Sequence, residues 1–154
     1  MKKVALVMGS ESDRPVVESS LEYFEYFGIP VDVLVMSAHR TPIQVQEFAV
    51  HAEENGYGVI VACAGMAAHL PGVIAAYTTL PVIGVPLSGS DLQGVDALYA
   101  MVQMPAGVPV ATVAIGKAGA RNAAVLAAQI LALSEPKIAE KLKAFKDNHC
   151  RIPS

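Results

Sequence analysis

A chain of 154 residues is long enough to bury one sizeable core and too short for two, so we expect a single domain over residues 1–154. The formal net charge is −3 and the basic residues are scattered, which excludes the basic face of a nucleic-acid-binding protein. The longest apolar stretches, such as Gly58 to Ala68, are shorter than a membrane span of about 18 to 20 residues. Neither nucleic acid nor a membrane is therefore an expected partner.

The composition is more apolar than a soluble monomer needs. Hydrophobic residues make up 53% of the chain and charged residues 16%, and the mean hydropathy is +0.44. We expect part of this excess to be buried between the subunits of a homo-oligomer. A monomeric core rich in Ala and Val is the alternative.

The N-terminus predicts a cytoplasmic location. Met1-Lys2-Lys3 leads directly into Val4 to Met8, without the separate apolar region and small-residue cleavage site of a signal peptide. Cys63 and Cys150 match neither a disulfide framework nor a metal-site spacing, so both are expected to be free thiols.

Five short runs rich in β-branched and apolar residues predict strands. Almost every residue in each run is apolar, instead of every second one, which is typical of strands covered on both faces in a parallel sheet. The predicted strands are Val4–Met8, Val31–Met36, Val59–Cys63, Val82–Val85 and Val110–Ile115.

Segments with helical periodicity alternate with these strands. Val17, Leu21 and Phe24 share one helical face after the first strand, and similar spacing recurs after the second strand and near the C-terminus. Repeated right-handed βαβ units predict a three-layer α/β/α, doubly wound, flavodoxin-like fold with a parallel sheet of strand order 2-1-3-4-5. Prolines suited to a first helical turn mark four helix starts: Pro15, Pro42, Pro71 and Pro136.

The stretch from Ala118 to Ala132 is unusually rich in small residues. It should pack closely against another helix. The sequence leaves open whether that helix belongs to the same subunit or to a neighbouring one.

Polar loops follow the first three predicted strands. In a doubly wound sheet these loops open on the same edge, where ligands bind near the topological switch point. Strands about 4.8 Å apart bring the three loops within about 10 Å of each other, so one small ligand could touch all of them. The loops span residues 9–13, 37–42 and 64–72.

The first loop combines a glycine, Gly9, with the hydroxyls of Ser10 and Ser12 and a following helix start, which is a general arrangement for anion binding. The alternative is that a serine merely caps the helix while Asp13 offsets its dipole. The loop lacks both the G-x-G-x-x-G spacing and the Gly-Lys-Ser/Thr of a Walker loop, which argues against large nucleotide cofactors.

The second loop places His39 beside Arg40, just before Pro42. Arg40 can hold phosphate or carboxylate through two parallel hydrogen bonds, and the His39 imidazole can exchange a proton near neutral pH. The alternative is a surface turn in which both side chains are simply solvated.

The third loop consists mainly of small residues and ends at His69. It would leave room for a planar ring and exclude water, although a helix-start histidine bonded to backbone is an equally acceptable role for His69. His51 and His149 are expected to be surface residues. No metal is expected, because His39 and His69 are not accompanied by Cys or carboxylate at a recognised ligand spacing.

Three groups of residues carry a family resemblance: Gly9-Ser10-Glu11-Ser12-Asp13, Ser37-Ala38-His39-Arg40-Thr41-Pro42 and Ala67-Ala68-His69-Leu70-Pro71-Gly72. They resemble the signature loops of the N5-carboxyaminoimidazole ribonucleotide mutases, the enzymes of the carboxylation step in bacterial purine synthesis. Further matching segments extend the resemblance over nearly the whole chain: Gly84-Val85-Pro86, Gly94-Val95-Asp96, Val102-Gln103-Met104-Pro105 and Ala114 to Gly119.

The resemblance implies an isomerase with no metal, biotin or nucleotide cofactor. Such an enzyme moves a carboxylate from the exocyclic N5 nitrogen to ring carbon C4, which converts N5-carboxyaminoimidazole ribonucleotide into 4-carboxy-5-aminoimidazole ribonucleotide. The resemblance also implies a homo-octamer of flavodoxin-like subunits. A functional link to the ATP-dependent N5-carboxyaminoimidazole ribonucleotide synthase is a further implication.

Residue roles follow from the same resemblance. Ser10, Ser37 and Arg40 would hold the substrate phosphate, Asp13 would hold the ribose hydroxyls, and His39 would be the general acid/base. The third loop would keep released carbon dioxide beside the ring and away from water. The other residues expected to line the substrate site are Ala38, Ala64, Gly65, Ala67, His69 and Leu70.

A sister group that carboxylates aminoimidazole ribonucleotide directly with carbon dioxide is the alternative enzyme. Its members typically carry Lys after the His and an Asn-Gly-Leu-Gly-Pro-like third loop, so Arg40 and Ala68-His69-Leu70-Pro71 favour the mutase. Departures from the mutase pattern are Met66, where Gly is frequent, Cys63 at a usually small position, and a short C-terminal tail.

The same fold also supports non-catalytic modules. A phospho-receiver needs an acidic cluster after the first strand and an Asp at the end of the third, where this chain has Met8-Gly9 and Cys63-Ala64. Flavin binding is disfavoured by the absence of Trp and of a hydroxyl-dense first loop.

Overall fold

The computed structural model describes residues 1–153. Its centre is a five-stranded sheet of order β2-β1-β3-β4-β5 in which every neighbouring pair is parallel, so the predicted strand order is confirmed. The strands are β1 (Lys3–Met8), β2 (Val31–Val35), β3 (Tyr57–Gly65), β4 (Val82–Leu87) and β5 (Ala111–Thr112).

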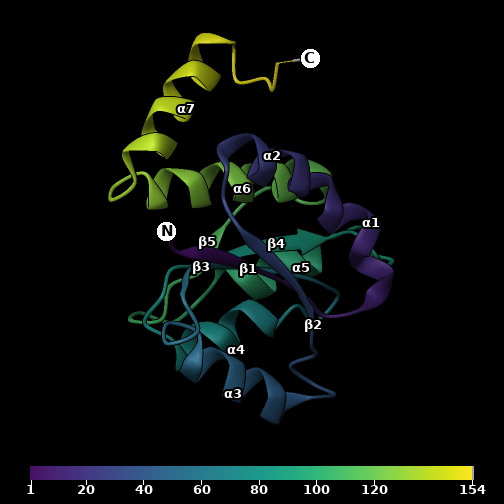
Figure 1. Ribbon diagram of the computed structural model, residues 1–154. Helices are drawn as coiled ribbons and strands as arrows, with labels where there is room; N and C mark the ends of the chain where they lie inside the picture. Colours follow the sequence, from purple (N-terminus) through teal and green to yellow (C-terminus); the bar gives the residue numbers. More distant parts are fainter. Residues whose placement is uncertain (154) are drawn as a thin grey trace.

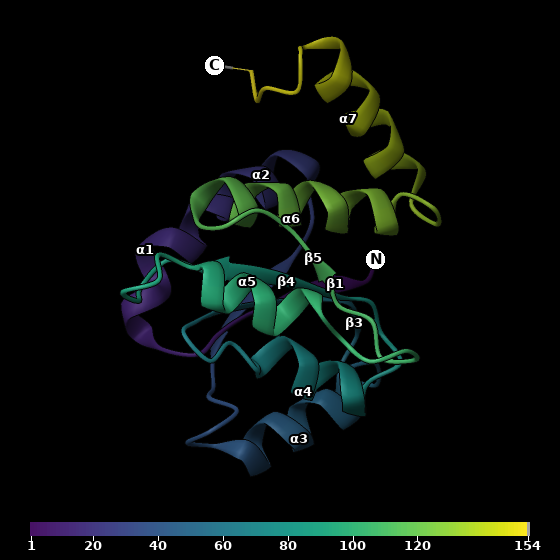
Figure 2. The same ribbon diagram turned by 180° about the vertical axis from the view of Figure 1, so that it is seen from behind.

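Helices cover both faces of the sheet, which confirms the predicted three-layer fold (Figure 1). One face carries α3 (Pro42–His51), α4 (Leu70–Tyr77) and α5 (Val95–Val102). The opposite face carries α1 (Arg14–Val17), α2 (Leu21–Phe27) and α6 (Lys117–Leu131), and α7 (Pro136–Asp147) packs outside α2 and α6. Figure 2 shows the same layers from behind. A proline lies in the first turn of α1, α3, α4 and α7, as predicted.

Side chains of β1 alternate between two cores. Val4, Leu6 and Met8 belong to the core shared with α2, α6 and α7, whereas Ala5 and Val7 belong to the core shared with α3, α4 and α5. All of them are fully buried. Because both faces of this central strand are covered, every position in it is apolar.

The two edge strands differ from the sequence-based expectation. Every residue of β2 is only partly buried, because β2 is paired with β1 alone and lies at the edge of the sheet. Both faces of β2 are nevertheless covered, because its valines pack against one core and Leu34 packs against the other, so β2 differs from the central strands only in how completely it is buried. Strand β5 is regular only at Ala111 and Thr112, not over the predicted residues 110–115, although the Val113 N–H still donates to the Gly84 carbonyl of β4 at 3.1 Å.

The alanine-rich stretch packs inside the subunit. Helix α6 contacts α2, β3 and β4, and its small side chains let it lie close to the sheet. Its fully buried alanines are Ala120, Ala123, Ala124, Ala127 and Ala128.

The helical segment between β1 and β2 is broken into short pieces. A 3₁₀ turn, η1 (Glu11–Asp13), precedes α1, and a second one, η2 (Glu18–Ser20), separates α1 from α2. The Ser19 hydroxyl donates to the carbonyl of Val16 at 2.6 Å, and the Ser20 hydroxyl donates to Val17 at 2.7 Å. Such bonds to the preceding turn compete with the regular helical ladder, which explains the break.

A polar network joins three strands at the end of the sheet opposite the loops of interest. Lys3 Nζ and the Tyr57 hydroxyl both donate to Asp32 Oδ2, at 2.7 and 2.8 Å, and Lys3 Nζ lies 4.4 Å from the centre of the Tyr57 ring. The hydrogen bond from Lys3, followed by that from Tyr57, lowers the pKa of Asp32 below its ordinary value. The network therefore ties β1, β2 and β3 together at their amino ends.

We expect Asp32→Asn to lower the free energy of unfolding at pH 7 by about 0.2 to 1 kcal/mol, the range for an exposed ion pair. A carboxyl with a lowered pKa in the folded state stabilises the fold above its unfolded pKa of about 3.9 and loses this effect as pH falls. Urea unfolding at pH 7 and pH 2.5 should show the deficit only at pH 7. Asp91→Asn, at an exposed turn, is the control, and an equal deficit at both pH values would contradict the assignment to charge.

Within residues 1–153, no helix combines the length and the apolar character needed to cross a membrane.

Candidate active site

A cavity of about 360 Å³ opens at the carboxyl edge of the sheet, where β1, β2, β3 and β4 end. Its walls come from the loops that follow these four strands. The lining residues are Gly9, Ser10, Ser12, Asp13, Ser37, Ala38, His39, Arg40, Ala64, Gly65, Met66, Ala67, Leu70 and Gly89.

Nearly all the residues expected at the substrate site line this cavity, and His69 is the exception. Gly9 and Ser12 belong to the predicted anion-binding loop and also line the cavity, whereas Met66 was not expected to bind the ligand. Gly89 follows β4, a strand whose loop the sequence reasoning did not consider. The sequence could have predicted this position. Strand β4 is next to β3 in the predicted order, so the loop after β4 also opens at the carboxyl edge of the sheet where ligands bind.

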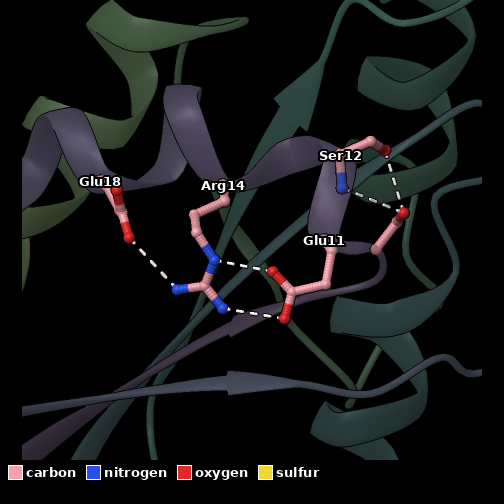
Figure 3. A network of polar contacts seen from close by, with 5 residues as sticks. Glu11, Ser12, Arg14 and Glu18 are labelled. Carbon is pink, nitrogen blue, oxygen red and sulfur yellow. Dashed lines mark hydrogen bonds and ion pairs between the residues drawn. The ribbon is translucent and has the colours of Figure 1, made fainter.

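The first loop is held in place by its serines. Ser10 precedes η1 in extended conformation, its Oγ accepts from the Ser12 backbone N–H at 3.3 Å, and the two hydroxyl oxygens lie 2.9 Å apart (Figure 3). Ser10 thus caps the turn and also lines the cavity. The two roles considered for this serine, helix capping and facing a ligand, are therefore compatible. The loop presents two hydroxyl groups to whatever occupies the cavity.

The second loop is a turn organised around Ser37. The Ser37 Oγ accepts the backbone N–H groups of His39 and Arg40 at 3.3 and 3.1 Å, and Thr41 Oγ1 accepts the Ser37 N–H at 2.9 Å. Because Ser37 Oγ accepts two hydrogen bonds, its own O–H remains free to donate to a ligand oxygen. The turn fixes the backbone of His39 and Arg40 and directs both exposed side chains to the cavity wall.

The second and third loops meet through two imidazole rings. His39 Nε2 and His69 Nδ1 lie 2.8 Å apart, and the ring planes are nearly perpendicular at 85°. His69 precedes α4 without capping it, so its ring bonds to His39 and not to backbone. One proton bridges the two facing nitrogens, because two N–H groups pointing at each other would repel.

Comparison with known proteins places this geometry in a family. The family model described as AIR carboxylase matches residues 3–151. This chain belongs to the AIR carboxylase family. The N5-carboxyaminoimidazole ribonucleotide mutase of Escherichia coli K12 is a similar protein. Its sequence is 56% identical to this chain over 144 residues, which cover 94% of this chain and 85% of that protein.

Other relatives agree with this AIR carboxylase assignment. The N5-carboxyaminoimidazole ribonucleotide mutase of Thermotoga maritima is 53% identical over 147 residues, covering 96% of this chain and 85% of that protein. A crystal structure of Treponema denticola PurE superposes with a TM-score of 0.85 at 28% identity, covering 96% of this chain and 90% of that one. The fold of this chain is thus shared with that solved structure.

Two residues that depart from the mutase pattern lie in β3 and in the loop that follows it. Met66 adopts a positive φ of 55°, which is uncommon for a residue with a side chain, and exposes 61% of its surface at the cavity mouth. Cys63 lies fully buried at the end of β3, and this burial raises the pKa of its thiol, with the charge of Asp13 acting in the same direction. Cys63 therefore fills space and is no nucleophile.

We expect Asp13→Asn to stabilise the ligand-free protein at pH 7. Burial raises the pKa of the Asp13 carboxyl, with a backbone hydrogen bond from Ser10 acting in the opposite direction. A carboxyl that ionises less readily in the folded state than in the unfolded state destabilises the fold once the pH exceeds its unfolded pKa of about 3.9. The urea midpoint of the variant should exceed that of the parent at pH 7 and match it at pH 3. A lower midpoint at pH 7 would contradict this expectation, and Asp91→Asn again serves as control.

Proposed function

We propose that this chain is an N5-carboxyaminoimidazole ribonucleotide mutase that acts in purine biosynthesis. The observation that carries the proposal is the placement of an imidazole, His39, on the wall of a cavity whose other polar groups suit a ribose phosphate. Relatives more than 50% identical over nearly the whole chain bear this name, which supports it.

The polar groups divide into two binding regions. Arg40 takes part in none of the ion pairs found within residues 1–153, so its guanidinium is available for the substrate phosphate, which Ser10 and Ser37 would also contact. The half-buried carboxylate of Asp13 would accept hydrogen bonds from the ribose hydroxyls. The aminoimidazole ring would then lie toward Ala64, Gly65, Ala67 and Leu70, with Ala38 beside His39.

The proposed reaction balances without a cofactor. The N5–carboxylate bond breaks, carbon dioxide is released, and the nitrogen takes up one proton from His39. Carbon dioxide then forms a bond to C4, and the C4 proton passes back to His39. One imidazole thus gives and regains one proton. The small residues of the third loop leave room for carbon dioxide next to the ring, and His69 orients the His39 ring through the 2.8 Å contact.

Direct carboxylation of aminoimidazole ribonucleotide is the second candidate, because the family model carries that description. The two reactions need the same heterocycle pocket and the same proton transfer at C4. They differ in the source of carbon dioxide, which is the substrate itself in the mutase and the solution in the carboxylase. Arg40 after His39 and the 68–71 loop sequence favour the mutase.

The deciding experiment supplies purified protein with N5-carboxyaminoimidazole ribonucleotide, without bicarbonate or ATP. Formation of the C4-carboxylated isomer is expected. A parallel reaction with aminoimidazole ribonucleotide and bicarbonate should be much slower. Efficient turnover only in the second reaction would assign the carboxylase, and turnover in neither would reject both candidates.

We further propose a homo-octamer in the cytoplasm, supplied with substrate by an ATP-dependent N5-carboxyaminoimidazole ribonucleotide synthase. The turn before α5 and α5 itself carry Leu92, Val95, Tyr99 and Val102, which expose 63%, 43%, 65% and 47% of their surface. The spacing of Val95, Tyr99 and Val102 puts these three on one face of α5, and such an apolar stripe on a subunit surface suits a subunit contact. Light scattering after size-exclusion chromatography should give the mass of eight chains, and a monomer would reject the proposal.

A further inference from the structure

An unusual charge distribution surrounds the proposed phosphate site. Between Lys3 and His39 the sequence contains a single basic side chain, Arg14, and it lies directly after the first loop. The nearest carboxylates in sequence are Glu11, Asp13 and Glu18, so the segment that would bind a phosphate dianion carries three acidic groups and one basic group. An uncompensated carboxylate in this segment would repel the ligand.

Arg14 is fully engaged by two of these acids. Its Nε donates to Glu11 Oε2 at 2.7 Å and its Nη2 donates to Glu11 Oε1 at 2.9 Å, a two-pronged ion pair, while Nη1 donates to Glu18 Oε1 at 3.2 Å. Glu11 precedes Arg14 by one turn and Glu18 follows it by one turn. The guanidinium therefore bridges η1, α1 and the start of η2 on one side of this helical segment.

Figure 3 shows that the Ser12 hydroxyl and the Glu11 carboxylate point away from each other, although the residues are adjacent. The cavity lining agrees, because it includes Ser10 and Ser12 but neither Glu11 nor Arg14. Arg14 thus holds Glu11 on the outer side of the turn, and the serine hydroxyls face the cavity. Since Arg14 does not line the cavity, its effect on a ligand is indirect.

We propose that Arg14 is a positioning residue which neutralises Glu11 and draws it away from the phosphate-binding turn, so that a phosphorylated substrate meets hydroxyl groups instead of a free carboxylate. This inference rests on the proposed function of the cavity. It predicts an effect on binding of the phosphate end and none on the proton transfer, because Arg14 contacts Glu11 and Glu18 and does not line the cavity that His39 lines.

The test measures KM and kcat for the isomerisation and, separately, the Kd of ribose 5-phosphate by calorimetry. Arg14→Gln should raise KM and Kd by about three- to tenfold at low ionic strength and leave kcat within about twofold. The double variant Glu11→Gln/Arg14→Gln should restore both constants to within about twofold of the parent. Glu25→Gln, which changes a carboxylate on α2, is the matched control and should alter neither constant.

Several results would overturn the inference. Unchanged KM and Kd in Arg14→Gln would show that an unpaired Glu11 carboxylate does not weaken phosphate binding. If the double variant still binds weakly, Arg14 contacts the ligand directly. If kcat falls by the same factor as KM rises, Arg14 has a general structural role. Glu11→Gln alone should tighten ribose 5-phosphate binding about twofold, and the lack of tightening would count against neutralisation even if Arg14→Gln did not fold.

The calorimetric measurement separates this inference from the proposed function. Ribose 5-phosphate carries the phosphate and the sugar but no heterocycle, so its binding does not depend on which reaction the protein catalyses. Absence of isomerisation with the expected pattern of ribose 5-phosphate affinities would reject the mutase and retain the role of Arg14.

Discussion

Asparagine in place of His39 is expected to lower kcat for the isomerisation by about 10³- to 10⁴-fold and to change substrate affinity by less than about threefold. Asparagine is shorter than histidine, so its amide does not reach His69 as Nε2 does, and it cannot take up and return a proton near neutral pH. The proposed reaction needs a proton at N5 in one step and its removal from C4 in the next. Steady-state kinetics and ribose 5-phosphate calorimetry on the same preparation provide the two constants.

The matched control for this prediction is His51→Asn. His51 is exposed on α3, its Nδ1 lies 2.9 Å from the Glu47 carbonyl oxygen, and it does not line the cavity. We expect parental kinetics from this variant. Turnover of His39→Asn within tenfold of the parent would remove His39 from the proton transfer, and a parallel loss of ribose 5-phosphate binding would show that the substitution damages the site as a whole.

Of the substitutions considered for their effect on stability, alanine in place of Gly119 is expected to lower the free energy of unfolding most. Helix propensity alone predicts the opposite sign, since replacing glycine by alanine inside a helix stabilises it by about 0.5 to 1 kcal/mol. A Cβ at Gly119, however, would overlap the carbonyl oxygen of Ala114 and lie 3.3 Å from Val85 Cγ1. The overlap involves backbone, which cannot rotate away as a side chain does.

We expect this overlap to dominate and to lower the free energy of unfolding by about 3 kcal/mol or more, the upper part of the range for overpacking. For a chain of this length the thermal midpoint should fall by about 6 to 12 °C. Gly89→Ala is the control, because a Cβ there meets nothing within 4 Å. A Gly119→Ala variant as stable as the parent would mean that the connection between β5 and α6 moves aside freely.

The sheet was predictable from the sequence because burial on both faces leaves a local pattern. The central strands β1, β3 and β4 are apolar at nearly every position, and that run of apolar residues identifies them without knowledge of their neighbours. The position of a strand at the edge of the sheet leaves no comparable pattern in the sequence. Strand β2 has an apolar sequence like the central strands, and its partial exposure depends only on which strand pairs with it.

The loops of the candidate site were predictable for a related reason. Once the strand order is known, the carboxyl ends of neighbouring parallel strands must meet, so Ser10, Ser37 and Arg40 are brought to one edge by topology. The 2.8 Å contact between His39 and His69 was not predictable in this way. It depends on the direction of two side chains from loops thirty residues apart.

The sequence by itself determined the strand order, the helix starts at prolines and the loops that form the cavity, because each depends on apolar runs, turn residues or topology that can be read locally. Tertiary structure alone decided the rest. It placed His69 behind His39 and not in the cavity wall, packed the alanine-rich α6 inside the subunit, and turned Glu11 outward onto Arg14. These outcomes depend on distances and side-chain directions between segments, which a linear pattern of residue types does not encode.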